Sequence, residues 1–131
     1  MIPVLAAAQV EDERCLPPSK KVVKLIDAGR EAKDTPTAVG KFEEAIDMAD
    51  DNAMAYFEFG MFAYNSALEY YKTHPNPMLG DKNFKKAEEM FLETIERCPD
   101  YHADCYYLLG VINYTQQDKL STIEGFKKFL E

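Results

Sequence analysis

Hydrophobic positions along this chain recur at the three- and four-residue spacing of amphipathic helices, and polar or proline-containing segments separate them. The first such run follows Ser19, a residue typical of helix N-caps, and predicts a helix over 20–32. Asp34-Thr35-Pro36 ends that helix and begins a second, because proline fits the first turn of a helix but not its interior. The pattern further predicts a long helix over 53–73, a helix that begins near 83, and helices over 101–116 and 120–131.

Every periodic stretch has helical spacing, so the sequence predicts an all-α fold. Pro75, Pro77 and Gly80 interrupt the pattern and predict a turn that extends from the end of the long helix to about position 83. Residues 1–18 show no helical period and end in a pair of prolines. We therefore expect a flexible tail over 1–18 and one folded domain over 19–131.

A small residue stands four positions before an aromatic residue three times in the chain. These pairs are Ala38 with Phe42, Ala87 with Phe91, and Thr122 with Phe126. The last two pairs are 35 residues apart and the first two are 49 apart, which fits a repeat of about 34 residues with one insertion of about 15. The insertion falls at the proline-containing segment, and the spacing indicates three helix pairs.

This pattern resembles the tetratricopeptide repeat (TPR), whose first helix carries a large residue and a Leu-Gly pair and whose second carries a small residue, an aromatic residue and a closing proline. The matching residues are Tyr56, Phe59, Gly60, Ala87, Phe91 and Pro99 in the middle unit, and Tyr106, Leu109, Gly110 and Phe126 in the last, where Thr122 replaces Ala. The first unit is degenerate, because Ile26 stands at the Gly position and Asp50 at the Pro position. The step from Ala38 to Gly60 is 22 residues, as the family spacing requires.

The resemblance implies three helix pairs in a short right-handed superhelix, with units of about 20–51, 52–99 and 100–131. In such repeats Gly or Ala lets paired helices approach closely, and an aromatic ring fills the space between them. One pair cannot bury its own apolar face, so about three are needed for a continuous core. We expect Phe91 to lie buried against the helix that carries Gly60.

TPR domains bind protein partners on the concave face that their first helices line. Counted from Gly60 and Gly110, the family spacing implies a partner-binding site of Met54, Phe57, Met61, Tyr64, Asn65, Asp104, Tyr107, Val111 and Tyr114, to which the degenerate unit adds Lys20, Val23, Asp27 and Arg30. An aromatic and Met-rich face suits the apolar side chains of a peptide, and we expect the aromatic residues to form one exposed strip. The alternative is that these residues pack on neighbouring helices. Phe57 and Met61 occupy two positions of the Lys and Asn clamp with which chaperone-binding members hold a terminal carboxylate, which disfavours that ligand.

Charge and composition narrow the function further. The formal net charge of −8 opposes binding to nucleic acid or to an anionic membrane surface, and no stretch approaches the roughly 20 apolar residues that insert into a bilayer. The two histidines are too far apart for a metal pair and the six glycines are scattered singly, so we expect no metal, cofactor or nucleotide site. His102 near Cys98 and Cys105 is the only candidate for nucleophilic chemistry, and we expect no catalytic residues and no enzyme.

The three cysteines are an odd number without compact spacing, so a disulfide framework is not predicted and buried thiols are expected. Whether Cys98 and Cys105 are oxidised stays open. Ala6-Ala7-Ala8 before Gln9 resembles the end of a secretory signal, although the basic region and most of the apolar region of such a signal are missing. Either these residues are a signal-peptide remnant of a periplasmic or envelope-associated protein, or they begin a cytoplasmic one.

Residues 127–131 lie inside a predicted helix, so we expect the chain to be part of something longer or to be capped by another molecule. Together with the signal-like start, the chain more narrowly resembles the N-terminal TPR module of PorE-type proteins of the type IX secretion system, Bacteroidetes envelope proteins that join TPRs to a β-propeller and an OmpA-like peptidoglycan-binding domain. The function that follows is a protein–protein interaction scaffold that holds a peptide segment or partner domain in a multiprotein assembly. The alternative is a homodimerisation module of a larger protein.

Overall fold

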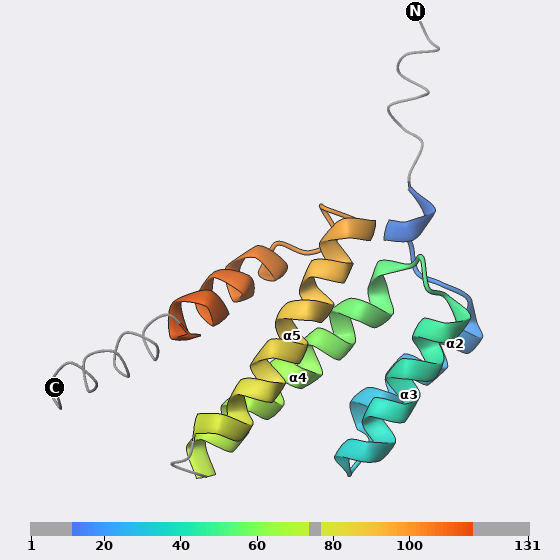
Figure 1. Cartoon of the computed structure of the whole chain (residues 1–131). Coiled ribbons are helices and arrows are strands. Elements are labelled where there is room, and N and C mark those ends of the chain that lie inside the picture. Colours follow the sequence, from blue (N-terminus) through green and yellow to red (C-terminus); the bar gives the residue numbers. More distant parts are fainter. Residues whose placement is uncertain (1–11, 74–76, 117–131) are drawn as a thin grey trace, which may run out of the picture.

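The structure is a computed structural model that describes residues 12–73 and 77–116 (Figure 1). Its elements are the short 3-10 helix η1 (Glu13–Cys15), the helices α2 (Lys20–Glu31), α3 (Thr35–Met48), α4 (Ala53–Thr73) and α5 (Pro77–Arg97), and a further helix over 104–116. None of the described residues lies in a β-strand. The all-α prediction is confirmed.

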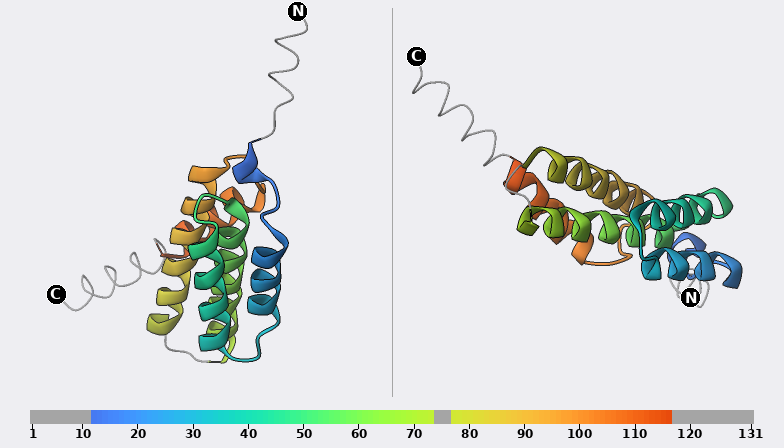
Figure 2. Two further views of the ribbon diagram at one scale, coloured as in Figure 1. Left: turned by 90° about the vertical axis from the view of Figure 1, so that its right-hand side faces the viewer. Right: turned by 90° about the horizontal axis from the view of Figure 1, so that it is seen from below.

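The four long helices form two antiparallel pairs that lie side by side (Figures 1 and 2). Helix α2 packs along α3, α4 packs along α5, and α3 joins the pairs by contacting α4. The helix over 104–116 adds Cys105, Leu108 and Ile112 to the core cluster of α4 and α5. No described helix is both long enough and apolar enough to cross a membrane.

Side-chain caps begin two of these helices. Ser19 Oγ accepts a hydrogen bond from the Val22 amide at 3.4 Å, and Asn52 Oδ1 accepts one from the Met54 amide at 3.0 Å. Such caps satisfy amide groups that have no partner inside the helix. They explain why α2 begins at Lys20 and α4 at Ala53, as the sequence pattern predicts.

Helices α4 and α5 have 21 residues each, and the segment predicted to be an insertion lies where they meet. Helix α5 begins at Pro77, whereas the sequence pattern placed its start near Asn83. That expectation was wrong because proline needs no hydrogen-bond partner for its nitrogen at the first helical position, so Pro77 starts a helix instead of ending a turn. The predicted helix over 120–131 and the pair Thr122 and Phe126 lie outside the described residues.

Both helix pairs contain a phenylalanine ring pressed against a glycine of the facing helix. A Cβ atom on Gly60 would lie 2.7 Å from the Phe91 ring, and one on Gly29 would lie 3.0 Å from the Phe42 ring. Both rings are fully buried, so the prediction for Phe91 is confirmed. The predicted register of the first pair was wrong, because the glycine that meets the Phe42 ring is Gly29, three residues after the predicted position Ile26.

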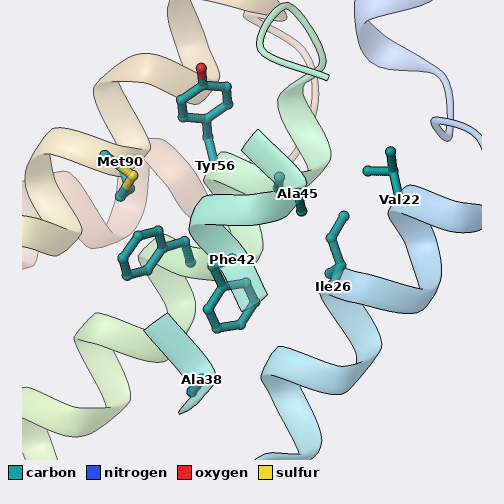
Figure 3. Packing of buried hydrophobic residues seen from close by; sticks show 9 residues of the cluster. Val22, Ile26, Ala38, Phe42, Ala45, Tyr56 and Met90 are labelled. Atoms are coloured by element: carbon teal, nitrogen blue, oxygen red, sulfur yellow. The ribbon is translucent and has the colours of Figure 1, made fainter. Parts of the chain in front are cut away.

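The short connection between α2 and α3 accounts for this shift. The prediction took a spacing of 16 residues from Ile26 to Phe42, as from Gly110 to Phe126, whereas Gly29 stands only 13 residues before Phe42. Ile26 itself is fully buried in a cluster to which α2, α3, α4 and α5 all contribute (Figure 3). Stacking of the Phe42 and Phe59 rings, 5.3 Å apart, joins the two pairs within this cluster.

The segment 12–18, which we call the N-terminal strap, is fixed to the helices. A disulfide joins Cys15 to Cys98, with their Cα atoms 5.4 Å apart, and Asn52 Nδ2 donates a hydrogen bond to the Leu16 carbonyl at 2.7 Å. Figure 1 shows η1 beside the end of α5. For residues 12–18 this corrects the expectation of a flexible tail, and it also corrects the expectation that the cysteines form no disulfide. Residues 1–11, with Ala6 to Gln9, lie outside the described residues.

Candidate functional site

An open cleft of about 610 Å³ runs along one face of α4. Helix α4 supplies most of its wall, the end of α2 supplies one residue, and the chain that follows α5 supplies two. The lining residues are Arg30, Phe57, Glu58, Met61, Phe62, Asn65, Ser66, Glu69, His102 and Asp104.

The spacing of the lining residues on α4 follows from helix geometry. Adjacent pairs line the cleft at 57–58, 61–62 and 65–66, and Glu69 continues the series. A four-residue step returns to nearly the same side of a helix, so these residues form one face. The other side of α4 is buried, because Phe59, Ala63 and Ala67 lie in the core. The helix can therefore present this face without losing its packing.

Aromatic packing closes one end of the cleft. The Phe57 ring stacks on the His102 ring at 4.9 Å and lies 5.4 Å from the Tyr101 ring. Phe57 is only 7% exposed. The chain that follows α5 covers the Phe57 ring. Phe57 therefore does not belong to the exposed aromatic strip that we expected, although it lines the cleft.

An ion pair connects α2 with α4 beside the cleft. Arg30 Nε lies 3.5 Å from Glu58 Oε2, and Arg30 Nη1 lies 3.8 Å from Asp27 Oδ1. The Glu58 side chain is 19% exposed. Burial raises the pKa of Glu58 above its ordinary value of 4.5, while the Arg30 guanidinium acts in the opposite direction. Arg30 therefore compensates only part of the cost of ionising Glu58.

His102 fixes the chain at the start of the last described helix. Its Nδ1 accepts a hydrogen bond from the Asp104 amide at 3.1 Å, which satisfies a free donor at the beginning of the helix over 104–116. The same imidazole stacks on Phe57. Both contacts hold Asp104 at the edge of the cleft.

The structure brings some of the predicted site residues together. Phe57, Met61 and Asn65 line the cleft with Arg30 and Asp104. Others lie elsewhere: Met54 and Val23 are half-buried, Lys20 is exposed, and Asp27 is exposed beside Arg30. Tyr64 is half-buried, with its ring edge-on to Phe84 at 5.8 Å.

The remaining predicted residues lie on one face of the helix over 104–116. Tyr107 and Tyr114 are 70% and 73% exposed, and Val111 between them is half-buried. None of the three lines the cleft. This face continues from Asp104, because positions 104, 107, 111 and 114 share one side of a helix. Burial raises the pKa of Tyr64, and the neighbouring Tyr107 adds to that effect.

The sequence prediction missed half of the cleft lining. The missed residues are Glu58, Phe62, Ser66, Glu69 and His102. Glu58, Phe62 and Ser66 each come one position after a predicted residue. At each turn of the helix, two neighbouring residues line the cleft, whereas the prediction took only one. A prediction that assigned a wider face of the helix to the site would have included these three residues. His102 was considered only as a partner for cysteine chemistry, and no local pattern shows that it stacks on Phe57.

The candidate cysteine chemistry is not supported by the geometry. Cys98 is bonded to Cys15, and Cys105 is buried. Burial, with a smaller contribution from Asp104, raises the pKa of the Cys105 thiol to about 11, so this thiol stays protonated at neutral pH. Among the described residues, no group of three His, Cys, Asp or Glu side chains is placed to hold a metal ion.

Comparisons with known protein families, curated proteins and solved structures find no match to this chain. The resemblance to TPR proteins therefore depends on the residues quoted from the sequence and on the two glycine–phenylalanine contacts.

Proposed function

We propose that this protein is a TPR-type interaction scaffold that binds a segment of a partner protein in the cleft along α4. The observation that carries this proposal is the cleft itself, which one face of the core helix α4 lines over three helical turns. Its volume of about 610 Å³ is in the range of protein ligand sites. Asn65 and Ser66 supply hydrogen-bonding groups beside the apolar Met61 and Phe62.

The packing of the helix pairs supports the TPR part of the proposal. The contact of Gly60 with Phe91 joins the two positions that the resemblance assigns to the repeat's glycine and aromatic residue. Gly29 makes a similar contact with Phe42 from three residues beyond the assigned position. Ala38 and Ala87, four residues before the two phenylalanines, are fully buried. The same small-residue and aromatic pair thus performs the same packing role twice.

The proposed binding surface extends beyond the cleft onto the helix over 104–116. Asp104 lines the cleft, and Tyr107, Val111 and Tyr114 continue the same helix face. Exposed tyrosines are common anchors of protein interfaces, because they bury a large area and lose few rotatable bonds. A partner segment longer than the cleft would contact this face next.

We also propose that the protein works in an oxidising compartment, such as the periplasm or cell envelope, within a secretion or envelope assembly. The Cys15–Cys98 disulfide supports this location, because reducing compartments keep most structural cysteines as thiols. The signal-like residues Ala6 to Gln9 are consistent with it.

Site-specific photo-crosslinking in the native host tests the proposed function. A benzoylphenylalanine at Asn65, in the cleft, should give a crosslinked adduct that mass spectrometry identifies as another protein. The same group at the exposed Glu44 of α3, which does not line the cleft, is the control. Equal adducts at both positions would contradict the proposal, and an adduct to a second copy of this chain would instead establish the homodimerisation module.

Asn65→Arg should block the cleft and abolish the adducts formed from a second crosslinker placed at Ser66. Asn65 is exposed, so the larger side chain should be accommodated without loss of folding. Gly40→Arg adds the same charge on the exposed side of α3, where an added Cβ atom meets no neighbour within 4 Å. Adducts that survive Asn65→Arg would show that the partner does not enter the cleft.

A further inference from the structure

The charges around the cleft are unbalanced. Three carboxylates, those of Glu58, Glu69 and Asp104, line it with a single guanidinium, that of Arg30. Arg30 is also shared, because Asp27 lies 3.8 Å from it on the side of α2. The net charge of the whole chain, −8, has the same sign. A complementary occupant of the cleft must carry positive charge.

Glu58 is the carboxylate that would gain most from a cation. Its side chain is largely buried, and its nearest cationic partner, Arg30 Nε, lies 3.5 Å away. That distance is longer than the 2.7–2.9 Å of a strong charge-assisted hydrogen bond. Burial keeps the pKa of Glu58 raised despite Arg30, so the ionised carboxylate is under-compensated in the free protein.

Apolar side chains flank this carboxylate. Met61 and Phe62 follow Glu58 by one helical turn and line the same cleft, and the stacked Phe57 and His102 rings close one end. Methionine adapts its shape to different apolar groups. The chemistry of the site thus combines one anionic position with an adjoining apolar one.

We propose that the cleft binds a basic segment of a partner protein, whose Lys or Arg side chain pairs with Glu58 and whose neighbouring large apolar side chain packs on Met61 and Phe62. This inference rests on the proposed function and names the class of ligand for it. Arg30 then competes with the ligand for Glu58. Removal of Glu58 and removal of Arg30 should therefore have opposite effects on binding.

A library of random dodecapeptides displayed on phage, selected against the immobilised full chain, tests this inference. The selected peptides should contain Lys or Arg next to Phe, Leu, Ile or Met, above the composition of the unselected library. The strongest selected peptide is then synthesised with a fluorescent label, and its affinity is measured by fluorescence anisotropy. Its binding should weaken as salt is added, because the charges involved are partly open to solvent.

Three variants assign this peptide to the site. Glu58→Gln should weaken its binding about tenfold, which corresponds to about 1.4 kcal/mol. Arg30→Gln should strengthen it, since the competing cation is removed. Glu44→Gln removes the same charge from the exposed side of α3 and should leave the affinity unchanged within about twofold, which controls for the net charge of the protein.

The possible outcomes separate the inference from the proposed function. Some selected peptides could lose binding to Asn65→Arg, which shows that they need an open cleft, and yet contain no Lys or Arg. Such peptides would overturn the inference and leave the proposed function intact. Weaker binding in both Glu58→Gln and Arg30→Gln would also overturn it, because the intact ion pair would then be the binding group. Selection of no peptide, or only of peptides that bind Asn65→Arg equally well, would contradict both.

Discussion

Two glycines in the interiors of neighbouring helices differ in how closely other atoms pack against them. A Cβ atom on Gly60 in α4 would meet the Phe91 ring at 2.7 Å, and one on Gly40 in α3 would meet nothing within 4 Å. Because Phe91 is fully buried, its ring has no open space into which to move. The same substitution should therefore have opposite effects at the two positions.

Gly60→Ala should destabilise the protein by about 1 to 3 kcal/mol, the usual cost of overpacking a core. Gly40→Ala should stabilise it by up to about 1 kcal/mol, because alanine favours the helix and restricts the unfolded chain. Urea unfolding of the two variants beside the parent measures both effects. Stabilisation by both substitutions would show that α4 and α5 are not packed as closely as described.

Burial of Glu58 predicts a dependence of stability on pH. Its pKa in the folded protein is raised above 4.5, so folding disfavours the ionised form. This cost is present above the raised folded pKa and disappears as the pH falls through it. Glu58→Gln should be more stable than the parent at neutral pH and equal to it below pH 4.5.

The urea midpoints of Glu58→Gln and the parent at the two pH values provide the measurement. Glu44→Gln, at an exposed position, is the control for loss of one carboxylate. A Glu58→Gln protein less stable than its parent at neutral pH would mean that the pair with Arg30 outweighs the cost of burial.

At the scale of elements, local signals predicted some features and missed others. The caps at Ser19 and Asn52 are short-range signals, and the starts of α2 and α4 followed from them. The start of α5 at Pro77 was missed, since one proline serves equally in a turn and at the first helical position.

Long-range contacts were beyond the sequence pattern. Cys15 and Cys98 are 83 residues apart, and no spacing rule connects them. The crossing of His102 over Phe57 likewise depends on how the chain leaves α5. Phe57, Met61 and Asn65 could be placed at a common surface because they share one helix face, whereas the pairing of Glu58 with Arg30 required the arrangement of α2 against α4.

The N-terminal strap and its disulfide should contribute strongly to stability. In the chain-entropy description, closing a loop of this length raises the free energy of the unfolded chain by about 4 to 5 kcal/mol. A reductant should lower the melting temperature of the parent and leave that of the double variant Cys15→Ser with Cys98→Ser unchanged. Cys105→Ala, which keeps the disulfide, should respond to reductant as the parent does.

Thiol counting provides an independent measurement of the disulfide. The unfolded, unreduced protein should react with alkylating reagent at one cysteine, Cys105, and the reduced protein at all three. Three reactive thiols without reduction would contradict the disulfide, and with it the main support for an oxidising compartment.

At the scale of the whole molecule, the proposed binding surface and the core lie on different sides of the same helices. Helix α4 packs on α5 and α3, and its remaining face lines the cleft. The helix over 104–116 buries Cys105, Leu108 and Ile112 against this assembly and leaves Tyr107 and Tyr114 exposed. Substitutions on the exposed faces should therefore change binding without changing folding.

Tyr107→Ala is the substitution that tests this separation most directly. Because its side chain is 70% exposed, truncation removes little buried area and should leave the melting temperature nearly unchanged. If the partner extends from the cleft past Asp104, loss of this aromatic anchor should weaken its capture about 30-fold, equivalent to roughly 2 kcal/mol. The measurement is a pull-down of the protein that crosslinks from Asn65, together with a melting curve. A much lower melting temperature would place Tyr107 in the core, and normal capture would confine the binding surface to the cleft.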